Sequence, residues 1–304
     1  MIIGSKQIEY ILNPESIERV VHQYTLQQMC MLNLFEPQNN YGETTFEYAS
    51  SKRTYETDLA EGILAEPVEI TEGSSYPQVS FSGIQEEYGN MTRFGFEVEF
   101  SQEAAKKPSN YTFFRNCIAD MGLTMARMIN RFAFVELNAS AGLVDPIELE
   151  DGAWVRGNES VDDDIVAIKR AMENQPHYMN KYSPTLMYTS KTAYDTAEDL
   201  YKVINASGTF NGVSNGIRMS PAEEIKTGLM AIDLSCHPAT WYFNLHEGDN
   251  RLNDPKVPRS SLINVHYFES DENDKYPHSF GYQMSVELGL AVDTEMAVLT
   301  QSGV

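Results

Sequence analysis

The stretch SNYTFFRNCIADMGLTMARMINRFAFVELNAS, residues Ser109–Ser140, decides how the rest of this sequence is interpreted. Its apolar residues recur at steps of three and four, which is the spacing that lines up one face of an α-helix. Pro108 precedes a polar pair, Ser109 and Asn110, that can cap the first turn. The sequence therefore predicts one long amphipathic helix over about 109–140. Its apolar stripe consists of Phe114, Ile118, Met121, Met125, Met128, Ile129, Phe132 and Val135.

A helix of this length needs support along its side, because the average globular helix has only about 11–12 residues. Sustained heptads with charged flanks, which would indicate a coiled-coil partner, are absent from the stretch. We therefore expect a sheet to lie along the helix, and the segment Tyr88–Ser101 supplies a strand for it. In this segment Phe94, Phe96, Val98 and Phe100 alternate with Arg93, Gly95, Glu97 and Glu99.

Composition and charge limit the class of protein. The chain has 304 residues, of which 42% are hydrophobic and 22% charged, a globular composition that fits one or two domains. Its formal charge of -22 argues against a nucleic-acid-binding surface as the main function, because the chain would repel DNA and RNA. No apolar run reaches the roughly 18–20 residues needed to cross a bilayer. We expect a soluble protein without a signal peptide and without a membrane partner.

The sequence predicts no catalytic, cofactor-binding or metal-binding residue. Cys236 and His237 are adjacent, but neighbouring residues of a strand point to opposite faces, so we favour a core cysteine beside a surface histidine. The acids at 162–164 stand where a helix N-terminus favours negative charge. The polar run Asp271–Asp274 lacks the glycine and the final glutamate of a calcium loop, which leaves at most a weak cation site. Neither the glycines at 208, 212 and 216 nor the spacing of the six histidines matches a phosphate loop or a zinc motif.

The remaining segments predict an α+β chain. A helix is expected from Asn13 and Pro14 to just before Pro37. Residues 41–84 alternate like strands but contain few positions that look core-filling, so we expect this excursion to lie on a neighbouring subunit or another domain. Beyond the long helix we expect helices near 160–172 and 190–204, strands at 185–189, 230–233, 240–245 and 262–268, a capping box that starts a helix at Ser220–Glu223, and one or two strands within 282–299 that close the sheet.

The order of these elements resembles the major capsid protein of tailed viruses of bacteria and archaea, which has the Hong Kong 97 phage-type capsid fold. Four segments carry the resemblance. They are the strand and turn Phe96–Glu103, the long helix Ser109–Ser140, the strand leading into a helix at Pro184–Ser190, and the closing strands at 288–300.

The resemblance implies an α+β fold with an N-terminal arm at 1–40, an extended hairpin called the E-loop with its base at 41–84, a peripheral (P) domain at 85–150 and 280–304 with a spine helix, and an axial (A) domain at 151–279. It implies a structural head protein, not an enzyme, that forms hexamers and pentamers of an icosahedral shell around double-stranded DNA. The implied partners are further copies, with portal, scaffolding, protease and decoration proteins as other candidates. The protein would be made in the host cytoplasm and reside in the virion, and no long scaffolding segment is expected inside this chain.

Two other classes remain open from the sequence. A cellular shell of the encapsulin type shares the fold, and a cargo-enzyme gene next to this one would favour it. An unrelated α/β enzyme is the third class, and a ligand or metal bound to the purified monomer would favour that.

Overall fold

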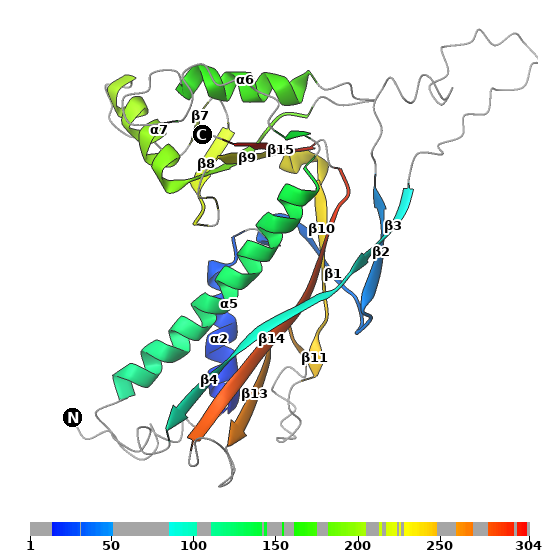
Figure 1. The fold of residues 1–304 in the computed structure, drawn as a ribbon, viewed down its shortest axis with the longest axis vertical. Coiled ribbons are helices and arrows are strands. Elements are labelled where there is room, and N and C mark those ends of the chain that lie inside the picture. Colours follow the sequence, from blue (N-terminus) through cyan, green and yellow to red (C-terminus); the bar gives the residue numbers. More distant parts are fainter. Residues whose placement is uncertain are drawn as a thin grey trace, which may run out of the picture. The chain divides into compact units, whose positions relative to one another are not determined.

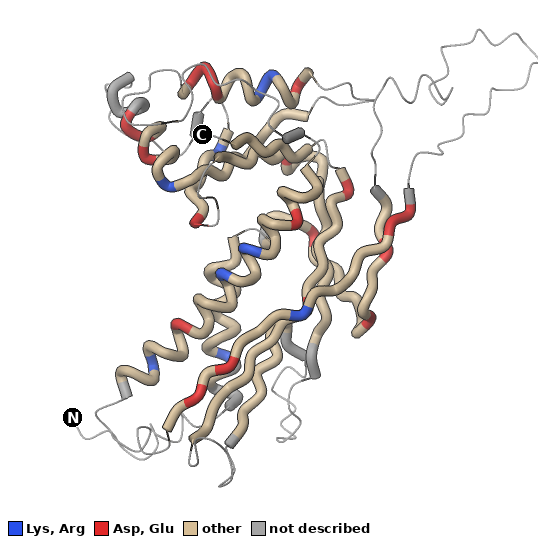
Figure 2. Tube along the Cα trace, in the orientation of Figure 1, with Lys and Arg blue, Asp and Glu red and all other residues tan. Residues whose placement is uncertain are grey.

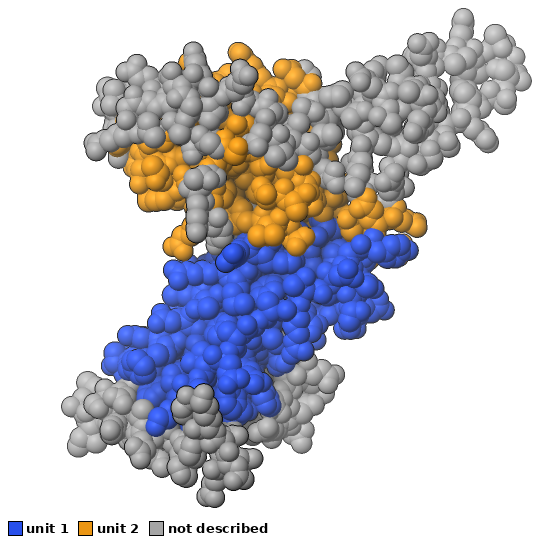
Figure 3. Space-filling view, in the orientation of Figure 1, with its two compact units in different colours: residues 1–46, 88–133, 241–291 blue, residues 47–87, 134–240, 292–304 orange. Residues whose placement is uncertain are grey.

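The computed structural model describes residues 14–30, 32–50, 85–101, 111–141, 143–144, 154, 161–174, 182–204, 213–214, 217–223, 225, 228–247, 260–269, 279–294 and 297–302. The chain has a mixed α+β fold with two compact units, each of which is described by itself. Unit 1 comprises Met1–Phe46, Tyr88–Ala133 and Trp241–Ala291, and unit 2 comprises Glu47–Glu87, Phe134–Thr240 and Val292–Val304 (Figure 3).

Unit 1 is built on a sheet that centres on the long strand β14, Ser279–Val292 (Figure 1). β4, Thr92–Ser101, pairs antiparallel with β14 along all ten of its residues. β13, Asn264–Glu269, also pairs antiparallel with β14. β10, Ala239–Phe243, stands between β14 and β1, Glu36–Asn39, in the strand order. β14 therefore pairs with β4, β10 and β13, and β1 joins the sheet through β10.

The apolar face of β4 packs on the long helix α5, Tyr111–Ala139 (Figure 1). The Phe94 ring lies 5.7 Å from the Phe132 ring, and the Phe100 ring lies 5.2 Å from the Phe114 ring. The alternate residues of β4, from Arg93 to Glu99, are exposed. The structure thus confirms the predicted strand and the sheet alongside the helix.

The predicted long helix is confirmed, since α5 has 29 residues. Most of its predicted stripe is buried or half-buried, and Met125 and Ile129 are fully enclosed. Val135 is the exception, because it lies one helical turn beyond exposed Arg131 and is itself 56% exposed. Asn130, which is not part of the predicted stripe, is buried as well.

Asn130 also explains why the N-terminal helix is shorter than predicted. The helix α2, Pro14–Gln28, ends at Gln28, not just before Pro37. Beyond it the Asn130 side chain donates to the Gln28 carbonyl oxygen at 3.1 Å and accepts the Cys30 N–H at 3.1 Å. The first bond satisfies one of the carbonyl groups that the end of a helix leaves without partners, and the second holds the chain just beyond that end. A side chain 100 residues away thus stabilises the break in the helix.

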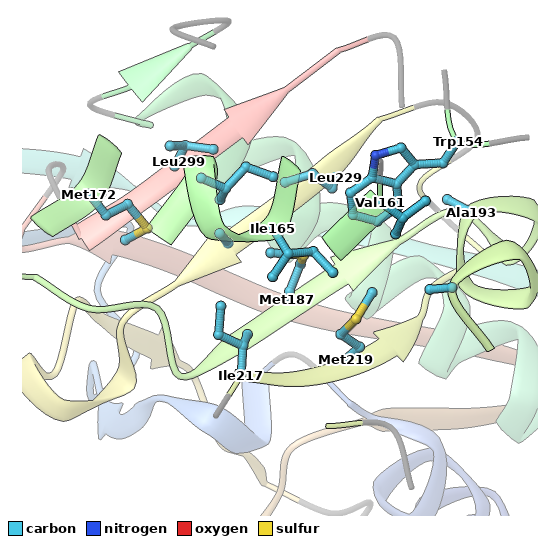
Figure 4. Packing of buried hydrophobic residues seen from close by; sticks show 13 residues of the cluster. Trp154, Val161, Ile165, Met172, Met187, Ala193, Ile217, Met219, Leu229 and Leu299 are labelled. Atoms are coloured by element: carbon cyan, nitrogen blue, oxygen red, sulfur yellow. The ribbon is translucent and has the colours of Figure 1, made fainter. Parts of the chain in front are cut away.

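Unit 2 is a six-stranded sheet with two helices on it. Its strand order is β5-β15-β9-β6-β8-β7. The helices α6, Val161–Glu173, and α7, Lys191–Ile204, bury apolar side chains against the sheet residues of β6, β8, β9 and β15 (Figure 4). The strands are β5 Leu143–Val144, β6 Leu186–Thr189, β7 Val213–Ser214, β8 Ile217–Pro221, β9 Leu229–Ile232 and β15 Val298–Gln301.

Two predicted features of the second half are wrong in detail. The segment Ser220–Glu223 starts no helix, because Ile217 and Met219 are buried alternately in β8, which runs parallel to β6 up to Pro221. The Ala222 N–H continues the pairing by donating to the Thr189 carbonyl at 3.0 Å. The strands within 282–299 do not close one sheet, because β14 belongs to the sheet of unit 1 and β15 to that of unit 2.

The other described elements are short, and two pairs of them form two-stranded sheets, β2 with β3 and β11 with β12. Of the excursion predicted at 41–84, residues 51–84 lie outside the described residues. The short elements are η1 Leu32–Leu34, β2 Thr45–Ser50, β3 Gln85–Asn90, η3 Leu234–Cys236, β11 His246–Glu247 and β12 Ser260–Ser261.

A proline in the middle of α5 should unfold unit 1. Met125 is fully buried, and Met125→Pro removes a helix hydrogen bond and forces the ring against the preceding turn, which costs about 3 kcal/mol or more. We expect soluble folded chain to be largely lost, as measured by thermal melting followed by circular dichroism.

Thr124→Ala is the control for this experiment. Thr124 is exposed, and its hydroxyl donates to the Asp120 carbonyl of its own helix at 2.7 Å. Since alanine is the stronger helix former, the control should melt at or slightly above the wild-type temperature. A proline variant as stable as the wild type would show that unit 1 does not depend on an intact α5 for its stability.

Candidate assembly site

The excursion predicted at 41–84 includes the strand β2, and Phe46 of β2 packs within unit 1. Phe46 is only 5% exposed, whereas its neighbours Thr45 and Glu47 are exposed. Its ring stacks on that of Tyr242 in β10, with centroids 4.2 Å apart and planes 15° from parallel. Phe46 thus packs the start of this strand against β10.

Two glycines leave the space that the Phe46 ring fills. A Cβ atom added to Gly89 of β3 would stand 2.1 Å from the ring, and one added to Gly289 of β14 would stand 2.2 Å from it. Both distances are far below van der Waals contact. The stack on Tyr242 prevents the ring from moving away, so each position requires a residue without a side chain.

The turn that precedes β2 is tied to the sheet by two asparagines. The Asn40 N–H donates to the Phe243 carbonyl at 2.8 Å, and its side-chain amide donates to the carbonyls of Glu43 at 2.8 Å and Thr45 at 3.0 Å. Asn244, which is 3% exposed, accepts the Gly42 N–H at 2.9 Å.

The Asn244 amide also donates to the Glu43 carbonyl and to Oε2 of Glu287, each at 3.0 Å. Glu287 belongs to β14, so one asparagine joins the turn to the central strand. We call the set of Asn40, Phe46, Gly89, Tyr242, Asn244 and Gly289 the hairpin anchor. All six residues belong to unit 1, and they hold the chain at the start of β2 and the end of β3.

Sequence reasoning missed the hairpin anchor. It treated residues 41–84 as having few core-filling positions, and the burial of Phe46 corrects this for the start of β2. A signal was present, because a glycine inside a strand pattern often marks the close approach of another group, and both Gly89 and Gly289 stand in such patterns. What approaches them could not be inferred, since Phe46 lies far away along the chain.

The residues weighed for chemistry are held in structural roles where the structure describes them. Cys236 ends the short helix η3, and its thiol donates to the Asp233 carbonyl at 3.3 Å. Burial, and then the nearby charge of Asp233, raise the pKa of the Cys236 thiol to about 11. The thiol is therefore protonated at neutral pH and is a poor nucleophile. His237, next to it, is exposed and caps η3 in the left-handed conformation.

The acids at the start of α6 also have structural surroundings. Asp164 is buried, and its Oδ2 atom accepts a hydrogen bond from the Trp154 indole at 2.9 Å. Among the described residues no group of three or more potential metal ligands is found. No helix in the same part of the chain is long and apolar enough to span a membrane. The acidic run 271–274 lies outside the described residues.

Charge is unevenly distributed along the chain. α5 carries Arg115, Arg127 and Arg131 against Asp120 and Glu136, which gives +1 in a chain whose total is -22 (Figure 2). All three arginines are exposed. Val135, which is 56% exposed, lies one helical turn beyond Arg131, so this part of the helix offers positive charge beside an exposed apolar residue.

The comparison with protein families identifies the class of this protein. A family model described as phage capsid protein matches residues 86–295, which is more than half of the chain. The chain belongs to this family of phage capsid proteins. No curated protein sequence matches it significantly.

Solved structures with the same fold include several capsid shells. A virus-like particle from Pyrococcus furiosus matches with a TM-score of 0.58 at 9% identity, covering 95% of this chain and 98% of that one. The mature capsid of bacteriophage PhiM1 matches with a TM-score of 0.54 at 9% identity, covering 88% and 84%. The encapsulin of Synechococcus elongatus matches with a TM-score of 0.52 at 10% identity, covering 90% and 86%. At such identities the likeness shows the capsid fold alone.

Family and fold together define a structural protein that builds a shell from copies of itself. They indicate a non-enzymatic role and residence in the virion capsid, and they support neither an unrelated α/β enzyme nor its chemistry. The hairpin anchor therefore belongs to a subunit that forms contacts with other subunits.

The glycine at 289 should be intolerant of any side chain. Gly289→Ala places a methyl group against the Phe46 ring, and such overpacking costs about 1–3 kcal/mol. The measurement is urea unfolding of the wild type and of the variant. Shortening the ring in Phe46→Leu should relieve the clash, so Gly289→Ala should be less destabilising in the Phe46→Leu background. Strictly additive effects in this double-mutant cycle would contradict the close packing of the two residues.

Proposed function

We propose that this capsid protein assembles as hexamers and pentamers into an icosahedral shell that encloses packaged double-stranded DNA. The observation that carries the proposal is the family match over 86–295, which runs from β3 through β14. The match includes α5 and, except for β1 and β15, the strands of the two large sheets. Closed shells are built from heterologous contacts that close on themselves, so each subunit needs complementary surfaces on different sides.

The division of the chain that we propose follows the fold of the family. It has an N-terminal arm at 1–40, an E-loop with its base at 41–84, a P domain at 85–150 and 280–304, and an A domain at 151–279. The hairpin anchor supports the start of the E-loop, because it holds the chain at residues 40–46 while β2 and β3 continue as a separate two-stranded sheet. The long helix α5 supports the assignment of the spine helix.

Further copies of the chain are the main partners in this proposal, with portal, scaffolding, protease and decoration proteins as candidates for the rest of the head. DNA would be enclosed without sequence-specific binding, because a subunit with a charge of -22 repels the phosphate backbone. Synthesis would take place in the host cytoplasm before assembly.

An encapsulin-type cellular shell is the second candidate, and the likeness to the encapsulin of Synechococcus elongatus favours it. The contents of the natural particle distinguish the two functions. Genomic DNA inside would support the viral head, whereas an enclosed enzyme would support the cellular compartment.

Removing the part of the excursion beyond the anchor should separate folding from assembly. We expect the wild-type chain to form closed particles of megadalton size, seen by negative-stain electron microscopy and sedimentation. Replacing residues 54–82 by a short Gly/Ser linker should leave a folded subunit, because Phe46 and Gly89 are retained, and should abolish the particles. Burial of the excursion against a neighbour contributes free energy to the interface and not to the subunit, at about 25 cal/mol per Å².

The matched variant for this experiment extends the replacement to residues 44–82, which removes Phe46. This variant should melt at a lower temperature and should also fail to form particles. Its loss of stability follows because the space next to Gly89 and Gly289 that the Phe46 ring fills becomes empty. Normal particles from the shorter replacement would contradict an assembly role for the excursion. A wild-type chain that stays monomeric at every salt and protein concentration would contradict the shell itself.

Assembly should strengthen with salt. Each subunit carries -22, so subunits repel one another over a Debye length of about 30 Å at 0.01 M salt but only about 10 Å at 0.1 M. Light scattering as a function of sodium chloride concentration should show a lower critical concentration at the higher salt. Assembly that is stronger at low salt, or tight binding of the subunit to DNA, would contradict this electrostatic account.

A further inference from the structure

Tyr41 combines a strained backbone conformation with an exposed aromatic ring. Its backbone adopts a φ of +54°, in the left-handed region that residues other than glycine rarely occupy, and its side chain is 88% exposed. Isolated exposed apolar residues are common on protein surfaces. A bulky residue held at positive φ is not, and such strain persists where the surrounding structure enforces it, often at functional positions.

The backbone around Tyr41 is fixed on both sides. The Tyr41 N–H donates to Oδ1 of Asn39 at 3.0 Å, and the next N–H, that of Gly42, donates to Oδ1 of Asn244 at 2.9 Å. The Glu43 N–H closes the turn by donating to the Asn40 carbonyl at 3.1 Å. The turn therefore presents the Tyr41 ring to solvent from a backbone that is already ordered. Binding through a preorganised group loses less conformational entropy than binding through a mobile one.

The charges next to Tyr41 limit what its ring can meet. Residues 36–50 contain three glutamates, Glu36, Glu43 and Glu47, and no lysine or arginine, and all three glutamates are exposed. Two such turns would repel each other, so a symmetric contact between two copies of this turn is disfavoured. The turn suits a surface that combines apolar contact with positive charge. Exposed Arg131 and Val135, one turn apart on α5, show that this chain carries such a combination.

We propose that Tyr41 is an assembly contact whose ring docks on a different surface of a second copy of this chain. The inference rests on the proposed shell, because a capsid subunit is surrounded by copies of itself. A contact between two unlike surfaces is heterologous, which is the type that builds rings and closed shells. Tyrosine is well suited to the role, because it buries a large ring at the expense of only two side-chain torsions and is enriched among the residues that dominate interfaces.

The test compares three substitutions at this position. Tyr41→Gly and Tyr41→Asn both accept a positive φ, but both remove the ring. The subunit should melt at the wild-type temperature or above it, measured by circular dichroism below the assembly concentration. The critical concentration for particles, measured by sedimentation velocity, should rise about tenfold or more. Tyr41→Phe keeps the ring and should assemble at the wild-type concentration.

Each alternative outcome is distinguishable. Tyr41→Gly and Tyr41→Asn subunits that assemble as readily as the wild type would overturn the inference and leave the shell intact. Subunits that melt well below the wild type would also overturn it, because the ring would then stabilise its own turn. A loss of assembly in Tyr41→Gly but not in Tyr41→Asn would assign the effect to backbone freedom and not to the ring. Failure of the wild type to form any assembly would overturn the proposed shell and, with it, the second copy as the partner.

Discussion

A helix of 29 residues can be buried only by something of comparable length, and this constraint organises the fold. β4 and β14 provide that length, since their pairing continues over ten residues without a break. The aromatic residues of β4 reach α5 at both ends of this pairing, through Phe100 with Phe114 and Phe94 with Phe132. The asparagine that ends α2 projects from the same helix. β4 and the first helix of unit 1 thus both contact this one helix.

The sequence is a good guide to the elements whose burial repeats with their own period. α5, the alternating face of β4 and the uniformly buried strand β6 follow from local patterns. In these elements the polarity of most residues matches the burial of their own positions. Local patterns could not reveal the end of α2, because the bonds that stabilise it come from Asn130. The polar start of a helix expected at Ser220 was outweighed by the pairing of β8 with β6, which buries Ile217 and Met219.

The hairpin anchor shows the same limit at the candidate site. The turn at Tyr41–Gly42 and the two glycines within strands were visible in the sequence, but the partners that give them meaning were not. Gly289 lies far along the chain from Phe46, and only the fold brings the two together. This also accounts for similar folds at about 9–10% identity. Capsid subunits share a pattern of long-range packing that different side chains can satisfy.

The path of the chain through β3 and β4 has a mechanical consequence. The two strands are separated only by Met91, so the hairpin continues directly into the strand that lies along β14. Hydrogen bonds in an antiparallel ladder are perpendicular to the strands. A pull on the hairpin along its axis therefore loads the whole ladder in shear, and the bonds must fail together instead of opening one by one from an end. Tension that reaches a subunit through this hairpin therefore acts on the β4–β14 ladder in the direction in which the ladder resists force best.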